Sequence, residues 1–194
     1  AADELLVVAR STASGKLMLC AVPADSEGVT VTHQATLDQS RPMANLYCEG
    51  VHVGQSAVLC DDWEDSLAVV LNMGRILVAA EQVGCAQAAL DMSVAYTGER
   101  IQFGRTIASF QAIKHKAADM MLKTESARSL LYYAACTADA WLRGAATAQA
   151  LGEAAHMVAS SAGDAAFFVA GTAIQLHGGV GITEEYDVQL YFKR

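Results

Sequence analysis

Hydrophobic residues in the first sixty positions gather in short runs that predict β-strands. The runs are rich in valine and leucine and cover residues 5–9, 16–22, 29–33 and 45–52. Turn-forming pairs, Ser14-Gly15 and Glu27-Gly28, separate the first three runs. The run 16–22 has too few polar residues for clean alternation, which favours a strand that is buried on both faces.

After Cys60 the apolar positions recur at helical spacing. Three long helices and the start of a fourth are predicted, over residues 61–99, 109–141, 147–176 and from 183 onward. Asp61 and Asp62 are candidate N-caps of the first helix, Ser109 of the second and Thr183 of the fourth. Helices this long need partners, so the pattern predicts members of one helical bundle.

The two patterns together predict an α+β fold, with a β part over residues 1–60 and a helical part over 61–194. Residues 66–90 are apolar, but Arg75, Glu81 and Gln82 interrupt them. We therefore expect a core helix of a soluble protein rather than a membrane span. Many alanines suggest helices that meet through small side chains. The chain starts almost directly with a strand-like run, which suggests that it begins inside a domain.

Charge and cysteine content narrow the class of protein. The net charge of −8 makes a general nucleic-acid surface improbable on physical grounds, because such a surface needs a basic face. The five cysteines are widely spaced and form no CxxC pair, which argues against a disulfide framework or a zinc site. We expect reduced thiols, a cytoplasmic location, no signal peptide and no metal.

The break between the first two long helices carries the strongest chemical signal. Arg100 and Gln102 offer cationic and amide donors suited to a phosphate, and Gln111 adds a second amide. Phe103 and Phe110 could contact a flat ring. The alternative is an ordinary turn whose arginines, Arg100 and Arg105, lie in solvent and whose phenylalanines belong to the core.

Two other features add to this signal. The sequence Gln175-Leu176-His177-Gly178-Gly179 is followed by Gly181, and its glycines would let the backbone approach a ligand closely. The alternative is a helix end with His177 simply packed. Arg75 lies in an apolar helix and needs an anionic partner, from a neighbouring helix or from a ligand.

These segments together resemble the C-terminal half of an acyl-CoA dehydrogenase. The first motif runs from Tyr96 through Glu99-Arg100, Gln102-Phe103-Gly104 and Phe110-Gln111 to Lys114-His115. The second, at 175–186, follows about sixty residues later. The resemblance implies the end of a middle β-domain followed by an up-down four-helix bundle, with the family's N-terminal helical domain absent.

The resemblance also implies FAD, held across a subunit interface, with the bundle gripping the adenine end of a neighbour's flavin. Arg100 and Gln102 would bind the pyrophosphate, Phe103 would line that site, and Phe110 and Gln111 would border the adenosine. A further set would offer an amide and close backbone to the same cofactor: Gln175, Leu176, His177, Gly178 and Gly179. Asn72 and Arg75 would contact the acyl-CoA.

The implied reaction is α,β-dehydrogenation of an acyl-CoA thioester to the trans-2-enoyl-CoA, which requires a glutamate base. One family position for that base is occupied by Gly74, and the other would lie beyond Arg194, so the catalytic residue is not assigned. Glu81 matches neither position. An electron-transfer flavoprotein is the expected electron acceptor, and fatty acids or steroid side chains are the expected substrate classes.

Three readings of the function stay open at this point. The first is an active dehydrogenase subunit of a homo- or hetero-oligomer, with a dimer of dimers expected. The second is a non-catalytic partner that completes the FAD site and the oligomer of a heteromeric enzyme. The third is a relative with other flavin chemistry, such as a monooxygenase or a nitroalkane oxidase.

Overall fold

The computed structural model describes residues 3–61 and 63–194. It divides into one unit over Ala1–Val70 and a second over Leu71–Arg194. The proposed capping role of Asp62 lies outside the described residues. Each unit is considered by itself.

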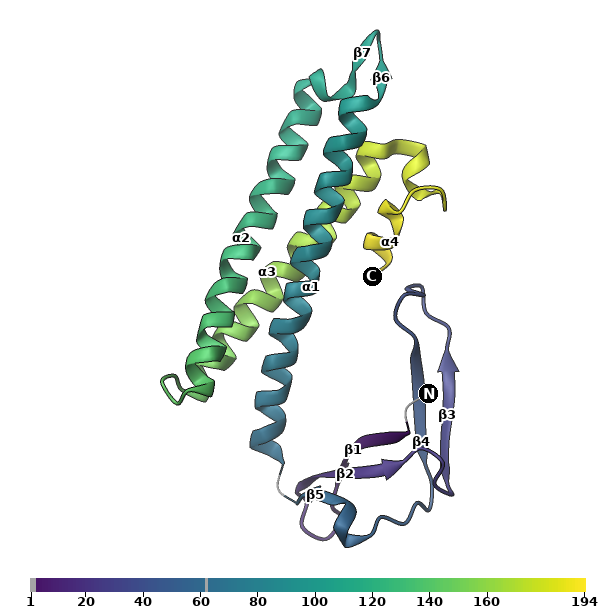
Figure 1. The fold of residues 1–194 in the computed structure, drawn as a ribbon, viewed down its shortest axis with the longest axis vertical. Helices are drawn as coiled ribbons and strands as arrows, with labels where there is room; N and C mark the ends of the chain where they lie inside the picture. The colour runs from purple at the N-terminus through teal and green to yellow at the C-terminus, as the bar shows by residue number, and fades with distance from the viewer. Residues whose placement is uncertain (1–2, 62) are drawn as a thin grey trace. The chain divides into compact units, whose positions relative to one another are not determined.

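The first unit is built on antiparallel strands (Figure 1). β1 (Glu4–Arg10), β2 (Leu17–Pro23) and β5 (Val58–Cys60) form a sheet in the order β1-β2-β5. In β2 the consecutive residues Cys20, Ala21 and Val22 are all buried, so both faces of that part of the strand are covered, as its unbroken apolar pattern predicts.

A second antiparallel pair joins β3 (Val29–Gln34) to β4 (Met43–Cys48), in register from Val29 opposite Cys48 to Gln34 opposite Met43. The strand predicted over 45–52 is therefore wrong at both ends. It stops at Cys48 because Gly50 takes a φ of 66°, which turns the chain out of the extended conformation. The short strand β5 was not predicted.

The second unit contains three long helices: α1 (Glu64–Glu99), which begins in the first unit, α2 (Gln111–Leu142) and α3 (Ala148–His177). Their ends agree with the predicted ranges to within a few residues. Thr147 caps α3, its hydroxyl accepting a hydrogen bond from the amide of Ala150 at 3.1 Å. Ser109 is not the cap of α2, since Phe110 holds that position and the Ser109 hydroxyl donates to the carbonyl of Thr106.

Small residues build the core where the helices meet, as the alanine content predicts. The central cluster draws on α1, α2, α3 and the short α4 (Val188–Lys193). Its members are Ala86, Ala89, Leu90, Met120, Val169, Ala173, Leu176 and Val188. Alanine brings helix axes close together, and the larger side chains fill the remaining space.

The predicted fourth helix starts later than expected. Residues Gly178–Ile182 form a 3₁₀ turn, η3, and α4 begins only at Val188. The Thr183 hydroxyl donates back to the carbonyl of Val180 at 2.8 Å, so it stabilises the turn instead of capping a helix. The structure therefore places a compact 3₁₀ element between α3 and α4.

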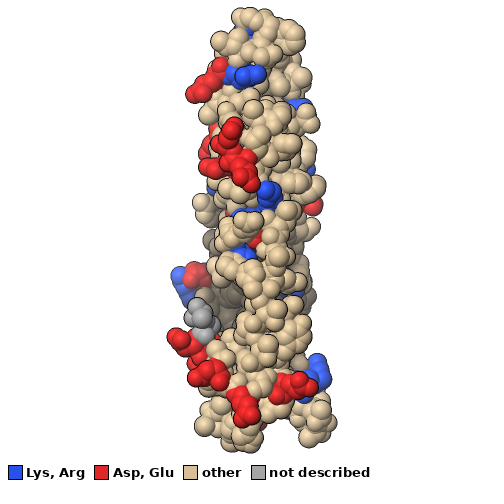
Figure 2. Space-filling view, turned by 90° about the vertical axis from the view of Figure 1, so that its right-hand side faces the viewer, with Lys and Arg blue, Asp and Glu red and all other residues tan. Residues whose placement is uncertain are grey.

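By length and composition, α1 and the segment Ala148–Ile182 would each be long and apolar enough to cross a membrane. Core helices of soluble bundles meet the same criterion, and both helices contribute to the central cluster. The face in Figure 2 shows Lys and Arg atoms scattered among acidic atoms and wide uncharged areas. A bundle core remains our prediction for these two helices.

Candidate functional site

The segment after α1 forms a tight hairpin that the sequence did not predict. β6 (Ile101–Gln102) pairs with β7 (Arg105–Thr106), with Ile101 opposite Thr106 and Gln102 opposite Arg105. The two turn residues, Phe103 and Gly104, have φ values of 55° and 76°. Positive φ at both positions suits the twist of a two-residue hairpin, and Phe-Gly is an unusual pair for it.

Phe103 is held in an unfavourable conformation with its side chain in solvent. It is 92% exposed, and it is the only described residue other than glycine with a positive φ. Its ring meets Phe110 edge-on at 6.0 Å, and the Arg105 guanidinium lies 4.1 Å from the centre of the Phe110 ring. Arg105, which was not among the predicted cofactor-binding residues, thus belongs to the same cluster through a cation–π contact.

The backbone of Arg100 is held by hydrogen bonds, whereas its side chain is exposed to solvent. Its amide donates to the carbonyl of Tyr96 at 2.9 Å, and its carbonyl accepts from Ile107 at 2.8 Å. Within residues 3–61 and 63–194 its guanidinium has no salt-bridge partner, and the side chain is exposed. Gln102 is also exposed, and its amide donates to the adjacent Ile101 carbonyl. The Arg100 guanidinium, which has no anionic partner among the described residues, can therefore bind an external anion.

The second predicted segment splits into exposed and buried residues. Gln175, Gly178 and Gly179 are exposed, whereas Leu176 and His177 are buried. A Cβ added at Gly178 or at Gly179 would meet no atom within 4 Å, so the backbone there is open to close approach. Leu176 belongs to the core cluster, and its side chain is therefore placed for packing.

His177 brings the two predicted segments together. Its ring stacks on that of Tyr96 with centroids 4.4 Å apart and an angle of 22° between planes. Tyr96 lies one helical turn before Arg100 and accepts the hydrogen bond from the Arg100 amide. Both motifs therefore meet at the same end of the bundle, where α1 ends and α3 ends (Figure 1).

The two residues predicted to contact acyl-CoA form a pair on α1. Nη1 of Arg75 donates to Oδ1 of Asn72 at 2.8 Å, and both side chains are half-buried. Across residues 3–61 and 63–194 Arg75 has no carboxylate partner, so an ion pair with a neighbouring helix does not explain it. A Cβ added at the adjacent Gly74 would meet nothing within 4 Å.

Glu81 has a different environment. It forms an ion pair with Arg194, and both side chains are about 30% exposed, at 31% and 29% respectively. The carboxylate is thus tied to the terminal residue of the chain. This ion pair argues against Glu81 as the catalytic base.

Residues 63–194 match the family model described as acyl-CoA dehydrogenase, C-terminal domain. The chain belongs to the acyl-CoA dehydrogenase family. The fold predicted from the resemblance, α+β with an acyl-CoA dehydrogenase-like bundle, is confirmed by the structural neighbours that share it.

Relatives match over nearly all of the chain. The acyl-CoA dehydrogenase IpdE2 of Mycolicibacterium smegmatis is 40% identical over 165 residues, which are 85% of this chain and 46% of that relative. Butyryl-CoA dehydrogenase from Megasphaera elsdenii has a TM-score of 0.88 at 30% identity, covering 99% of this chain and 50% of the other. A solved chain from work on the electron transferring flavoprotein of Acidaminococcus fermentans has a TM-score of 0.88 at 32% identity, with 99% and 50% covered. The chain thus spans about half the length of the relatives it matches.

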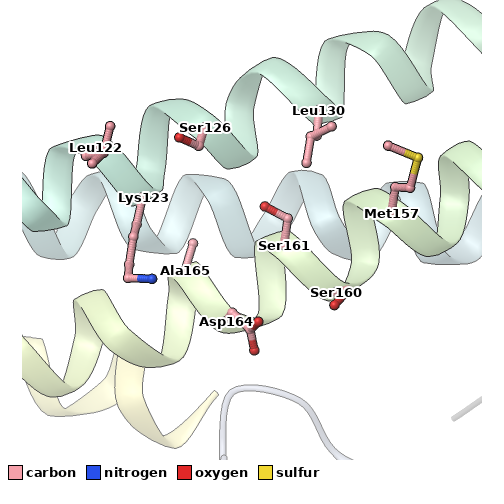
Figure 3. A pocket seen from close by; sticks show the side chains of 9 residues that line it. All are labelled: Leu122, Lys123, Ser126, Leu130, Met157, Ser160, Ser161, Asp164 and Ala165. Atoms are coloured by element: carbon pink, nitrogen blue, oxygen red, sulfur yellow. The ribbon is translucent and has the colours of Figure 1, made fainter.

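A groove between α2 and α3 is separate from the candidate cofactor and substrate residues (Figure 3). The groove has a volume of about 560 Å³, and its lining includes Lys123, Ser126, Ser161 and Asp164. None of the candidate cofactor or substrate residues lines it. We assign it no role.

Proposed function

We propose that this chain is part of an FAD-dependent acyl-CoA dehydrogenase and supplies the bundle half of a flavin site shared between subunits. The observation that carries the proposal is the meeting of two motifs at one end of the bundle. The Tyr96–His177 stack joins the last turn of α1 to the end of α3, so the Arg100 segment and the 175–179 segment lie on the same end.

The residues present fit the adenine-dinucleotide part of FAD. Among the described residues Arg100 has no ion-pair partner, so its guanidinium is suited to a pyrophosphate, and Gln102 adds an exposed amide. Phe103 offers an exposed ring directly after Gln102 in the same hairpin, and it meets Phe110, which lies directly before Gln111 at the start of α2.

Residues 175–179 would supply further contacts to the cofactor. The exposed Gln175 offers an amide, and Gly178 and Gly179 offer backbone that no side chain shields. Leu176 and His177 contribute from the buried side, by holding the segment in place. The exposed residues would contact the cofactor and the buried ones would support them. This arrangement agrees with a pocket that is complete only when a second subunit brings the flavin.

We propose Asn72 and Arg75 as contacts for the acyl-CoA. Their hydrogen bond orients the guanidinium, and the charge of Arg75 is left for an anionic group such as those of coenzyme A. The reaction removes a proton from Cα of the thioester and a hydride from Cβ, and yields the trans-2-enoyl-CoA. Bound flavin would supply the hydride acceptor for this reaction.

The catalytic base is left unassigned. Gly74 occupies one position that the family uses and has no side chain to accept a proton. Glu81 is engaged with Arg194. This favours keeping a second candidate, a non-catalytic partner subunit that completes the flavin site of a heteromeric dehydrogenase. Under either candidate we expect a cytoplasmic oligomer, built as a dimer of dimers, that passes electrons to an electron-transfer flavoprotein.

Substitution of Arg100 in the complete, assembled protein tests the flavin site. Arg100→Ala should raise the dissociation constant for FAD by about ten- to a hundredfold, because hydrogen bonds to charged groups contribute about 1.5–3 kcal/mol. Arg143→Ala is the matched control, since Arg143 is exposed and pairs with Asp139 at the end of α2. An unchanged FAD affinity in Arg100→Ala would refute the proposed site.

A second experiment separates the enzyme from the non-catalytic partner. The assembled holoprotein is mixed anaerobically with a series of acyl-CoA thioesters, and the visible absorbance of the flavin is followed. Bleaching that disappears when Arg75 is replaced supports a substrate site that includes this chain. Bleaching that is indifferent to every change in this chain would assign the chemistry to another subunit.

A further inference from the structure

The side chain of His177 is surrounded by the protein on several sides, which sets it apart from the exposed residues around it. It is 5% exposed, and Nδ1 lies 2.7 Å from the carbonyl oxygen of Ala173. Because a carbonyl only accepts, Nδ1 carries the hydrogen in this bond. The ring face rests on Tyr96, and Tyr186 meets it at a steep angle, with centroids 5.9 Å apart. The ring is thus held in one orientation.

Tyr96, the partner of His177 in the stack, is also hydrogen-bonded to the start of the Arg100 segment. Tyr96 lies in the last turn of α1, and its carbonyl receives the Arg100 amide. A stack that holds the Tyr96 ring would also restrict the rotation of that turn, and with it the point at which the chain enters the hairpin. Within the described residues the guanidinium of Arg100 itself makes no hydrogen bond or ion pair that could do this.

On its other side, His177 anchors a glycine-rich turn. It is the last residue of α3, and Gly178 follows with a φ of 66°. Glycine backbone has much conformational freedom to lose, so a turn of this composition needs an anchor. Gly181 folds back onto the same residue, since a Cβ there would lie 2.9 Å from Cβ of His177 and 2.8 Å from the carbonyl oxygen of Ile174.

We infer that His177 is a positioning residue, which couples the glycine turn to the Arg100 segment and does not itself contact the cofactor. The inference rests on the proposed function, and it revises the role that the motif alone would give His177. Holding two ligand-binding segments in a fixed relation lowers the ordering cost of binding. The aromatic stack is the part of the side chain that carries the coupling.

Two substitutions separate the ring from the hydrogen bond. His177→Phe keeps a ring against Tyr96 and loses the donor to Ala173, whereas His177→Asn keeps a polar donor and loses the ring. The dissociation constant for FAD is measured by flavin fluorescence in the complete, assembled protein. His177→Phe should stay within about twofold of the unmodified protein, and His177→Asn should weaken binding by about three- to tenfold, the range expected for an aromatic pair.

A double-mutant cycle distinguishes positioning from general destabilisation. If His177 acts through the Arg100 segment, His177→Asn should have little further effect on FAD affinity once Arg100→Ala is present. Additive effects of the two changes would overturn the inference. Where His177→Asn does not assemble, Tyr96→Leu removes the same stack from the other side, with Tyr96→Phe as its control.

The outcomes also separate this inference from the proposed function. An Arg100→Ala protein that binds FAD normally would overturn both. Weakened binding in Arg100→Ala together with normal binding in His177→Asn would overturn only the positioning role. Equal weakening in His177→Phe and His177→Asn would shift the role from the ring to the hydrogen bond and would overturn the coupling through Tyr96.

Discussion

Arg75 and Asn72, one turn apart on α1, are joined by a hydrogen bond of 2.8 Å from Nη1 to Oδ1. An amide orients a guanidinium but does not neutralise it. Arg128 offers a contrast in the same bundle, because it bonds to the Glu125 carboxylate at 3.0 Å as well as to Gln87. The half-buried charge of Arg75 therefore stays available to an anion from outside the described residues.

Replacing Arg75 should weaken the binding of acyl-CoA more than that of FAD. Arg75→Gln should raise the dissociation constant for the thioester by about tenfold or more, because a charge-assisted hydrogen bond is lost. Arg75→Lys should recover only part of the affinity, since lysine lacks the planar fork that can bond Asn72 and a ligand together. Isothermal titration calorimetry with a non-reactive thioester analogue measures the dissociation constants of both variants in the complete protein.

Arg128→Gln is the matched control for this prediction. It removes a half-buried arginine from the same bundle, but one that already has a carboxylate partner. Acyl-CoA affinity should be unchanged in this variant. Equal losses in the two glutamine variants would mean that Arg75 acts on the stability of the bundle and not on the ligand.

Replacement by alanine should lower the free energy of unfolding at one glycine of the second motif and leave it nearly unchanged at another. Gly181→Ala would place a Cβ within 3 Å of two atoms, the carbonyl oxygen of Ile174 and Cβ of His177, so we expect a loss of about 1–3 kcal/mol in the free energy of unfolding. Gly179→Ala has open space and should change stability by less than about 0.5 kcal/mol. Urea unfolding measures both.

Gly179→Ala should affect FAD affinity even though it hardly changes the stability of the fold. If the backbone at Gly179 approaches the cofactor, the added methyl group should lower FAD affinity while leaving the fold intact. A Gly179→Ala protein with full stability and full FAD affinity would remove this glycine from the site. The pair thus separates a packing glycine from a binding glycine.

The three long helices were predictable because their apolar positions recur at helical spacing, although the caps predicted at Ser109 and Thr183 were wrong. Thr147 caps α3 as a threonine at a helix start should, and Gly178 ends it with a positive φ. The alanine-rich pattern predicted close packing, which the central cluster confirms. These signals are local, so a single sequence displays them.

What the sequence could not display depends on contacts between distant residues. The hairpin at Phe103-Gly104 was missed because neither strand exceeds two residues and phenylalanine rarely adopts a positive φ. Arg105 was given no site role because its cation–π contact with Phe110 becomes visible only in the folded chain. A packed His177 was one of the two alternatives at the glycine motif, but its stack on Tyr96, eighty-one positions earlier, could not be predicted from that motif.

Glu81 gives a prediction against a catalytic role. Glu81→Gln should leave the turnover of the holoenzyme within about twofold, because the carboxylate is held by Arg194. The free energy of unfolding should fall by about 1 kcal/mol, at the upper end for a partly exposed ion pair. A loss of turnover by several orders of magnitude, with FAD still bound, would instead identify Glu81 as the base.

Thr147 should affect stability without affecting the flavin site. Thr147→Ala removes the hydroxyl that accepts from the Ala150 amide, which should cost about 1 kcal/mol in the free energy of unfolding. Thr147→Ser keeps an acceptor and should cost less than half as much. FAD affinity should be unchanged in both, because α3 has 30 residues and its two ends are about 45 Å apart at the rise of an α-helix. If Thr147→Ala weakened FAD binding as much as His177→Asn does, the flavin effect of His177 would reflect the stability of α3 as a whole, and the coupling through Tyr96 would lose its support.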